Sequence, residues 1–123
     1  MSVILAAIIY TLSKIKSDDN ILLFTEEKLI HLKRGIANEY EYNNLIKIEF
    51  VKPPKNRSYI QLFLKEKKFK FDIDTKNGQD VVLIDFINFL FTKNEGILIN
   101  QTINFHKYKY VKTGDSVRSI SLN

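Results

Sequence analysis

The sequence contains no cysteine and no tryptophan among its 123 residues, and only four glycines and two prolines. Without cysteine, neither a disulfide framework nor a thiolate metal site can form. Low glycine and proline content argues against disorder and against collagen-like repeats. A chain of this length fits one domain that is large enough to bury a single hydrophobic core. We therefore expect one small globular domain, and the absence of cysteine favours a reducing compartment such as the cytoplasm.

Long hydrophobic runs are also missing. The N-terminal apolar run, Val3–Leu12, has ten residues, whereas a membrane-spanning helix needs about twenty. A signal peptide carries Lys or Arg before its apolar stretch, but the first basic residue here is Lys14. We expect residues 1–17 to pack on the domain as a helix or a strand. The alternatives are an anchor at a membrane surface, which would make the protein peripheral to the membrane, or an interface with another chain.

Motifs for catalysis and metal binding are absent from the sequence. It has no glycine-rich phosphate loop, no G-x-S-x-G elbow and no H-E-x-x-H pair. His31 and His106 lie in alternating segments without a second histidine or a carboxylate at ligand spacing. Asp72–Gly78 differs from a calcium loop because Lys76 occupies a ligand position. We predict a protein that is not an enzyme and that needs no cofactor and no metal.

Alternation of apolar and polar residues predicts a chain made mainly of strands. Six segments between residues 18 and 93 are predicted strands: 21–25, 28–33, 39–42, 45–51, 59–64 and 69–73. The first and the fifth are apolar runs, and the other four alternate. In the fourth segment Ile46, Ile48 and Phe50 share the expected inner face. Residues 96–111 predict one more strand, and the polar composition from Thr113 onward predicts a frayed tail. The expected organisation is thus an N-terminal segment, a domain over 18–96, and a C-terminal strand with a frayed tail over 97–123.

One helix is predicted in residues 81–91, where only Asp85 and Asn88 are polar. At about 100° per residue, the apolar residues sweep an arc of roughly 220°. A helix on one sheet needs an apolar stripe a little over about 100° wide. The N-terminal run, the C-terminal tail or a second subunit must cover the excess, so a homodimer through 81–91 is one expectation. The fold class is α+β, a mainly antiparallel meander or partly open barrel closed by this helix.

Positive charge is concentrated in one stretch of the sequence. The chain has a formal charge of +5, and residues 52–70 alone carry seven basic residues and one acid, a net +6. Such a stretch is typical of a site for a phosphate-bearing partner, or of a solvated edge that lysine keeps from pairing. The candidate binding residues are Lys52, Lys55, Arg57, Lys65, Lys67, Lys68 and Lys70.

Residues 18–93 resemble the pleckstrin-homology-like fold, especially its bacterial and GRAM-type members. The resemblance rests on Phe24–Ile30 (FTEEKLI), on Tyr42–Ile48 (YNNLIKI), on Phe69–Phe71 and on the closing helix. It implies seven strands, of which the seventh would come from the N-terminal run or from a segment with weak alternation. Members that bind phosphoinositides carry Lys and Arg on and between the first two strands, whereas the corresponding turn here is Glu26-Glu27.

These observations predict a non-catalytic binding or scaffold module. Its partner would be a protein segment, held at a strand edge or in a groove beside the helix, or an acidic membrane surface that contacts the basic stretch. The alternative is a single-stranded nucleic acid, because tyrosines on strands can stack bases next to cations. That alternative would use the basic stretch together with Tyr59, Tyr108, Tyr110, Lys107 and Lys109.

Overall fold

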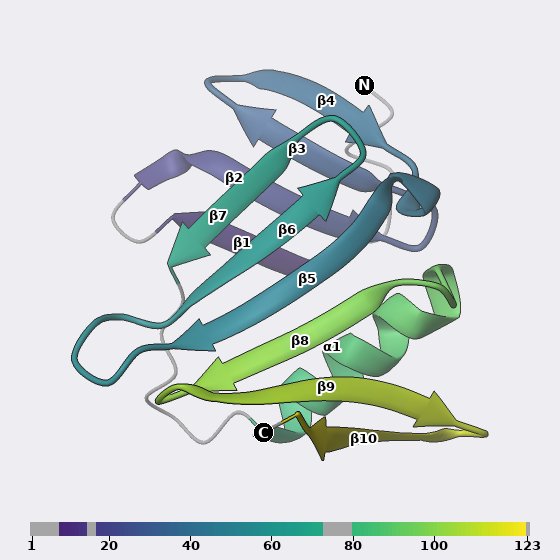
Figure 1. Ribbon diagram of the computed structural model, residues 1–123. Coiled ribbons are helices and arrows are strands. Elements are labelled where there is room, and N and C mark those ends of the chain that lie inside the picture. Colours follow the sequence, from purple (N-terminus) through teal and green to yellow (C-terminus); the bar gives the residue numbers. More distant parts are fainter. Residues whose placement is uncertain (1–7, 15–16, 73–79, 123) are drawn as a thin grey trace.

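The computed structural model describes residues 8–14, 17–72 and 80–122, which form two β-sheets and one α-helix (Figure 1). Sheet A contains the first four strands and sheet B the other six. The elements are β1 (Ile8–Lys14), β2 (Ser17–Thr25), β3 (Leu29–Lys33), β4 (Ile36–Tyr40), the 3-10 helix η2 (Tyr42–Asn44), β5 (Leu45–Lys52), β6 (Tyr59–Leu64), β7 (Lys68–Asp72), α1 (Asp80–Lys93), β8 (Leu98–Ile103), β9 (His106–Thr113) and β10 (Ser116–Ser121).

Sheet A is an antiparallel meander in the order β1-β2-β3-β4. Its β3–β4 turn is the pair Arg34-Gly35, with φ of 52° and 79°. Positive φ at both central residues is the geometry that two-residue hairpin turns favour, because its twist matches that of the strands. Gly35 adopts this conformation without a steric penalty.

Sheet B has the order β10-β9-β8-β5-β6-β7. Neighbours pair antiparallel except for β5 and β8, which pair parallel in the middle of the sheet. Parallel neighbours require a crossover connection, and here the chain from β5 to β8 includes β6, β7 and α1. The sheet therefore joins a hairpin before the helix (β6–β7) to a hairpin after it (β9–β10).

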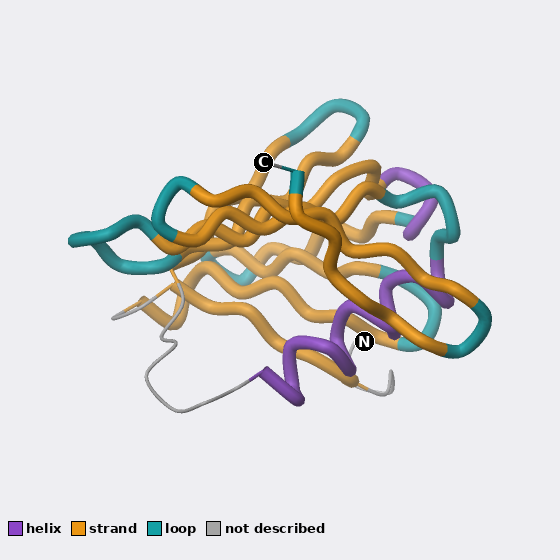
Figure 2. The backbone as a smooth tube through the Cα atoms, turned by 60° about the horizontal axis from the view of Figure 1, so that its bottom comes forward, coloured by secondary structure: helices purple, strands orange, loops and turns teal. Residues whose placement is uncertain are grey.

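The core lies on one face of sheet B, which sheet A and α1 cover between them (Figures 1 and 2). Phe86 of α1 sits where the three layers meet. Its ring centroid lies 5.0 Å from that of Phe24 in β2 and 6.4 Å from that of Phe50 in β5. The opposite face of sheet B, called here the outer face, has no described element packed on it (Figure 1).

The structure confirms the predicted α+β class: a mainly antiparallel, mixed-sheet protein with one helix. Within its described residues the sheets do not close into a barrel. Five of the six predicted segments lie in strands, apart from end residues, and the predicted helix is α1. In the segment 39–42 only Glu39 and Tyr40 belong to a strand, because Tyr42 begins η2. Residues 8–14 of the N-terminal segment form β1, which pairs with β2; residues 1–7 and 15–16 lie outside the described part, as does most of the Asp72–Gly78 segment.

Three further details of the sequence prediction are wrong. Ile46 is 45% exposed, because the register of β5 against β6 shifts between Leu45 and Lys47. Such a bulge changes the face on which the following side chains lie, so Leu45 occupies the core in place of Ile46. The single strand over 96–111 is two strands that meet at a turn. The tail is not frayed over Ser116–Ser121, because these residues pair with β9.

Part of the apolar surface of α1 is covered within the chain itself. Phe86, Ile87, Leu90 and Phe91 are buried, and the helix contacts both β9 and β10. Val117 of β10 packs against the core on this side. The C-terminal strands are thus one of the three candidate covers that the sequence offered for the wide apolar arc, and they contact the helix. In the described residues no helix is both long and apolar enough to cross a bilayer.

Candidate functional site

The basic stretch does not form one patch, because antiparallel pairing separates its two halves. β5 ends at Lys52 and β6 begins at Tyr59, so residues 53–58 form a loop at one end of these strands. The turn 65–67 lies at the other end, about 20 Å away for a six-residue strand. We call the first region the loop end and the second the turn end. The loop end holds Lys52, Lys55 and Arg57, while the turn end holds Lys65, Lys67 and Lys68; Lys70 lies between them on β7.

At the turn end, acidic and aromatic side chains surround the positive charge. Glu66 lies in the turn itself, and Lys67 Nζ donates to the Tyr40 hydroxyl at 3.3 Å. Glu39, next to Tyr40 on β4, forms an ion pair with Lys28. Lysines that interact with neighbours of the same chain contribute less net potential to an external anion.

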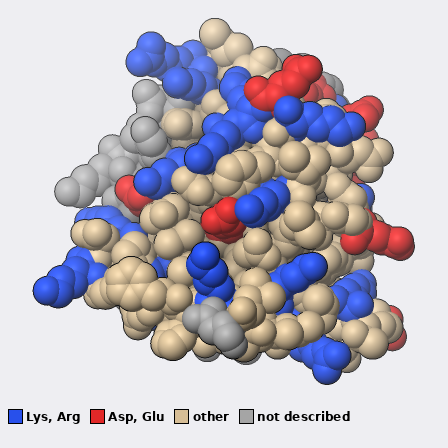
Figure 3. Space-filling view, in the orientation of Figure 1, with Lys and Arg blue, Asp and Glu red and all other residues tan. Residues whose placement is uncertain are grey.

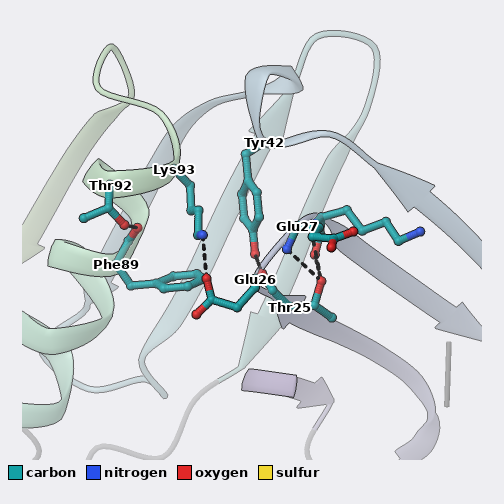
Figure 4. A network of polar contacts seen from close by, with 8 residues as sticks. Thr25, Glu26, Glu27, Tyr42, Phe89, Thr92 and Lys93 are labelled. Atoms are coloured by element: carbon teal, nitrogen blue, oxygen red, sulfur yellow. Dashed lines mark hydrogen bonds and ion pairs between the residues drawn. The ribbon is translucent and has the colours of Figure 1, made fainter. Parts of the chain in front are cut away.

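Further acidic residues near this side hold the β2–β3 turn against the end of α1 (Figure 4). Glu26 Oε2 accepts from Lys93 Nζ at 2.7 Å, and the Tyr42 hydroxyl donates to the backbone oxygen of Thr25 at 2.5 Å. The Thr25 hydroxyl accepts from the backbone N–H of Lys28 at 3.1 Å. Burial, assisted by the charge of Glu26, raises the pKa of Tyr42, so this hydroxyl remains a donor. The Glu26-Glu27 turn therefore has a structural role in joining β2 to the helix.

The loop end has a different character, since an exposed aromatic side chain accompanies its cations. Asn104 and Phe105 form a two-residue turn between β8 and β9, in which Ile103 pairs with His106. The backbone N–H of Asn104 donates to the oxygen of Lys52 at 3.0 Å. This bond joins the β8–β9 turn to the start of the 53–58 loop, and Figure 1 shows both at the same end of sheet B.

Phe105 is the most exposed large hydrophobic residue described, at 77% of its surface. Its φ is +74°, and that of Asn104 is +48°. A bulky side chain rarely adopts positive φ, and the left-handed conformation costs a non-glycine residue about 1–2 kcal/mol. Asn-Gly is the pair that this turn favours. Phe105 therefore contributes strain to the fold and little packing.

No acidic residue occurs in either segment of the loop end, neither in 52–59 nor in 103–107. Lys52, Lys55, Arg57 and Lys107 are all exposed. The nearest described acid in the pairing of the sheet is Asp72, which is opposite Tyr59 on β7. The loop end thus combines four cations with one exposed phenyl ring. Sequence reasoning found three of the four cations as part of the basic stretch, but it missed Phe105 because one aromatic residue between two strands leaves no periodic signal.

The tyrosines predicted to stack nucleic-acid bases do not share a surface. Tyr110 is buried, and its hydroxyl donates to Gln101 Oε1 at 2.6 Å. Tyr108 is two residues before it in the same strand and therefore lies on the same, core-facing side of β9. Tyr59 lies on the outer face, where Lys70 Nζ is 4.2 Å from its ring centroid.

Lysines contact the aromatic rings elsewhere on the outer face as well. Lys47 and Lys68 lie over the ring of Phe63, at 5.4 and 5.1 Å from its centroid. Figure 3 shows that Lys and Arg side chains are spread over this view of the molecule rather than gathered in one patch. The ring faces that bases would need are therefore already in contact with ammonium groups.

A buried histidine lies between the two sheets. His31 is 5% exposed, its Nε2 lies 2.6 Å from Asn20 Oδ1, and its ring centroid lies 4.5 Å from that of Phe69. Its Nδ1 is buried and has no hydrogen-bond partner in the described part of the chain. Burial, assisted by the charges of Lys67 and Lys33, lowers the pKa of His31 below its ordinary value of 6.5. The folded protein therefore favours the neutral imidazole.

This lowered pKa makes the stability sensitive to mild acid. Below pH 6.5 the histidine of the unfolded chain takes up a proton that the folded protein does not, so stability falls as the pH decreases. We expect the free energy of unfolding, measured by urea denaturation, to decrease between pH 6.5 and 5.5. His31 should contribute a slope of at most about 1.4 kcal/mol per pH unit. The His31→Gln variant should lose this slope, whereas variation of the exposed His106 to Gln should leave it in place. An equal slope in the His31→Gln protein would contradict this account.

Other features provide no clear chemistry. The described residues contain no group of three or more His, Cys, Asp or Glu side chains that could hold a metal ion. A hollow of about 570 Å³ is lined by Phe91, Thr92, Glu95, Lys112 and Gly114.

Comparison with protein-family models, with curated proteins and with solved structures finds no match to this chain. The loop end is the arrangement of described residues with the clearest binding chemistry.

Proposed function

We propose that this protein is a non-catalytic module that binds an acidic membrane surface through its loop end. Phe105 would insert among the lipid headgroups, and Lys52, Lys55, Arg57 and Lys107 would contact the anionic phosphates. The observation that carries the proposal is the 77% exposure of Phe105 in a turn of positive φ, beside a loop of cations. A strained and exposed aromatic residue adds little to the stability of the fold, and strained residues cluster at functional sites.

The magnitudes support reversible binding. A Lys or Arg near an anionic membrane contributes about 1 kcal/mol, and full burial of a Phe side chain contributes about 1.5–3 kcal/mol. Peripheral binding generally needs two such signals together. The loop end offers both kinds. At the turn end, Lys67 and Lys68 contact aromatic side chains of the same chain.

We also propose that residues 8–93 form a pleckstrin-homology-like domain. The supporting observations are the four strands of sheet A, the three-strand meander β5–β7 and the helix that follows. With β1 included, seven strands precede the helix, and β8–β10 extend the second sheet. The proposed membrane site is unlike the basic first hairpin of the phosphoinositide-binding members, because it uses the β5–β6 loop and the β8–β9 turn. Fold alone does not decide function.

The direct test is co-sedimentation with vesicles of phosphatidylcholine alone or of phosphatidylcholine with phosphatidylserine, at low and moderate salt. We expect binding to the anionic vesicles only, and weaker binding as salt screens the charges. A labelled single-stranded oligonucleotide serves as a parallel ligand. Binding to the oligonucleotide and not to the vesicles would overturn the proposal, as would equal binding to neutral vesicles at both salt concentrations.

Replacing Phe105 by glycine separates membrane binding from folding. The Phe105→Gly protein should be more stable than the wild type by up to about 1 kcal/mol, because glycine relieves the strain of a positive φ. It should nevertheless bind anionic vesicles at least roughly tenfold more weakly, because the phenyl ring is gone. Urea denaturation measures the first effect and vesicle titration the second.

Phe105→Ala is the matched control for this experiment. Alanine removes the ring but keeps a side chain at positive φ, so binding should fall as in the glycine variant without the gain in stability. If the glycine variant bound vesicles as tightly as the wild type, insertion of Phe105 would be excluded.

A further inference from the structure

The edge strand β10 has unusually regular backbone geometry for an exposed edge. It closes sheet B on the side away from β7 (Figure 1). Its pairing with β9 runs without a register shift from Ser116 opposite Thr113 to Ser121 opposite Tyr108. On its other side, β10 has no strand neighbour among the residues that the structure describes. In the described part of the chain, the main-chain donors and acceptors on this side therefore have no strand partner.

The residues that carry these groups follow from the ladder. The backbone N–H of Leu122 donates to the oxygen of Lys107 at 2.8 Å. Main-chain groups of successive residues in an antiparallel strand point alternately toward and away from the partner. The groups of Ile120 and Arg118 thus point toward β9, and those of Val117, Ser119 and Ser121 point outward.

The usual protections of an edge strand are missing from β10. Natural edges carry lysine, proline or a bulge that prevents pairing with another chain. β10 (SVRSIS) has no lysine or proline, and its single charged residue is Arg118. The opposite edge of sheet B differs, because β7 carries Lys68 and Lys70 and contacts β1. An open edge with free main-chain groups is a template for strand addition.

The charge beside this edge indicates the partner. Lys109 and Arg118 lie on the outer face of β9 and β10, on either side of the exposed Ile120, which is opposite Lys109. A second copy of this chain would bring another Arg118 to the same edge, and like charges across paired strands are unfavourable. An acidic strand would instead be attracted to both cations.

We propose that β10 binds an extended, acidic segment of a partner protein as an added strand of sheet B. The outward main-chain groups of Val117, Ser119 and Ser121 would form the ladder, and Arg118 with Lys109 would select acidic side chains. This site goes beyond the proposed membrane function, because it uses an edge of the sheet that contributes nothing to the loop end.

The test uses a fluorescein-labelled decapeptide in which valine and glutamate alternate, and a second one with lysine in place of glutamate. We expect the full-length protein to bind the acidic peptide and not the basic one in a fluorescence anisotropy titration. Ser119→Pro should weaken binding at least tenfold, because proline removes an outward N–H; an edge strand tolerates this substitution. The Ser119→Thr control keeps the N–H and should bind as the wild type does. Unchanged binding by the proline variant, or no binding by the wild type, would overturn the proposal.

Amide hydrogen exchange provides a second readout that does not depend on substitution. The acidic peptide should slow exchange at Val117, Ser119 and Ser121, while Arg118 and Ile120 are already protected by β9.

Sedimentation of the wild type alone tests whether a second copy of this chain binds the edge instead. A dimer that Ser119→Pro dissociates would assign the edge to a second copy of this chain and overturn the acidic-partner proposal. If the wild type bound anionic vesicles but not the acidic peptide, the strand-addition proposal would be wrong and the proposed membrane function would be unaffected.

Discussion

Truncation of Phe86 to alanine is expected to lower the free energy of unfolding by about 3–5 kcal/mol. The ring is 6% exposed and touches both sheets from the helix, through Phe24 and Phe50. Its removal leaves a cavity at a position where all three layers meet, and none of them can close the cavity without moving away from another. Because domains are stable by about 5–15 kcal/mol, this change removes a large part of the total.

Phe63→Ala is the matched control, since it deletes the same side chain from the outer face of sheet B. There the ring is half-buried and contacts Lys47 and Lys68, so we expect a loss of about 1–2 kcal/mol. Urea denaturation should show a lower midpoint with an unchanged slope for both variants. If the two losses were equal, the layers would not be joined at Phe86 in solution.

Replacement of Lys52, Lys55 and Arg57 together by glutamine is expected to weaken binding to anionic vesicles by about 3 kcal/mol, roughly two orders of magnitude. The three side chains are exposed and their own loop contains no acidic residue, so their removal should leave the stability almost unchanged. Vesicle titration at low salt provides the affinity, and the remaining binding should depend less on salt than that of the wild type.

The turn end provides a control with the same change in charge. Replacing Lys65, Lys67 and Lys68 by glutamine also removes three cations from the sequence stretch 52–70. If the loop end contacts the membrane, this variant should lose only a small part of the affinity, through the reduced net charge. Equal losses in the two triple variants would mean that overall charge, and not the loop end, determines binding.

Much of the fold could be predicted from the sequence because the described elements cover sheet B on one face only. In β7 buried phenylalanines alternate with exposed lysines, so the period of two is visible in the sequence. The bulge after Leu45 has no such signature, since the residues on either side of the shift are all aliphatic or basic. The β8–β9 turn was also missed, because Asn104-Phe105 lacks the glycine that marks a hairpin.

The candidate site was only half visible in the sequence for a related reason. Lys52 and Lys68 belong to one basic stretch, yet the antiparallel pairing of β5, β6 and β7 carries them to opposite ends of the sheet. Phe105 and Lys107, which are about fifty residues further along the chain, join Lys52 through the bond between Asn104 and the Lys52 oxygen. Only the parallel pairing of β5 with β8 brings these segments together.

That parallel pair also determines how the protein must fold. Lys47 pairs with Leu98 and Lys52 with Ile103, 51 residues apart in both cases. Closing so long a loop has an entropic cost before any contact forms, and sheets built on distant pairs fold slowly. During synthesis β5–β7 would be complete before β8 is made, so one edge of β5 would be unpaired in the meantime. A chain stopped before residue 98 would leave that edge open to aggregation. The pairing of β5 with β8 brings the segments of the loop end together. Formation of the same pairing is therefore the step on which productive folding depends.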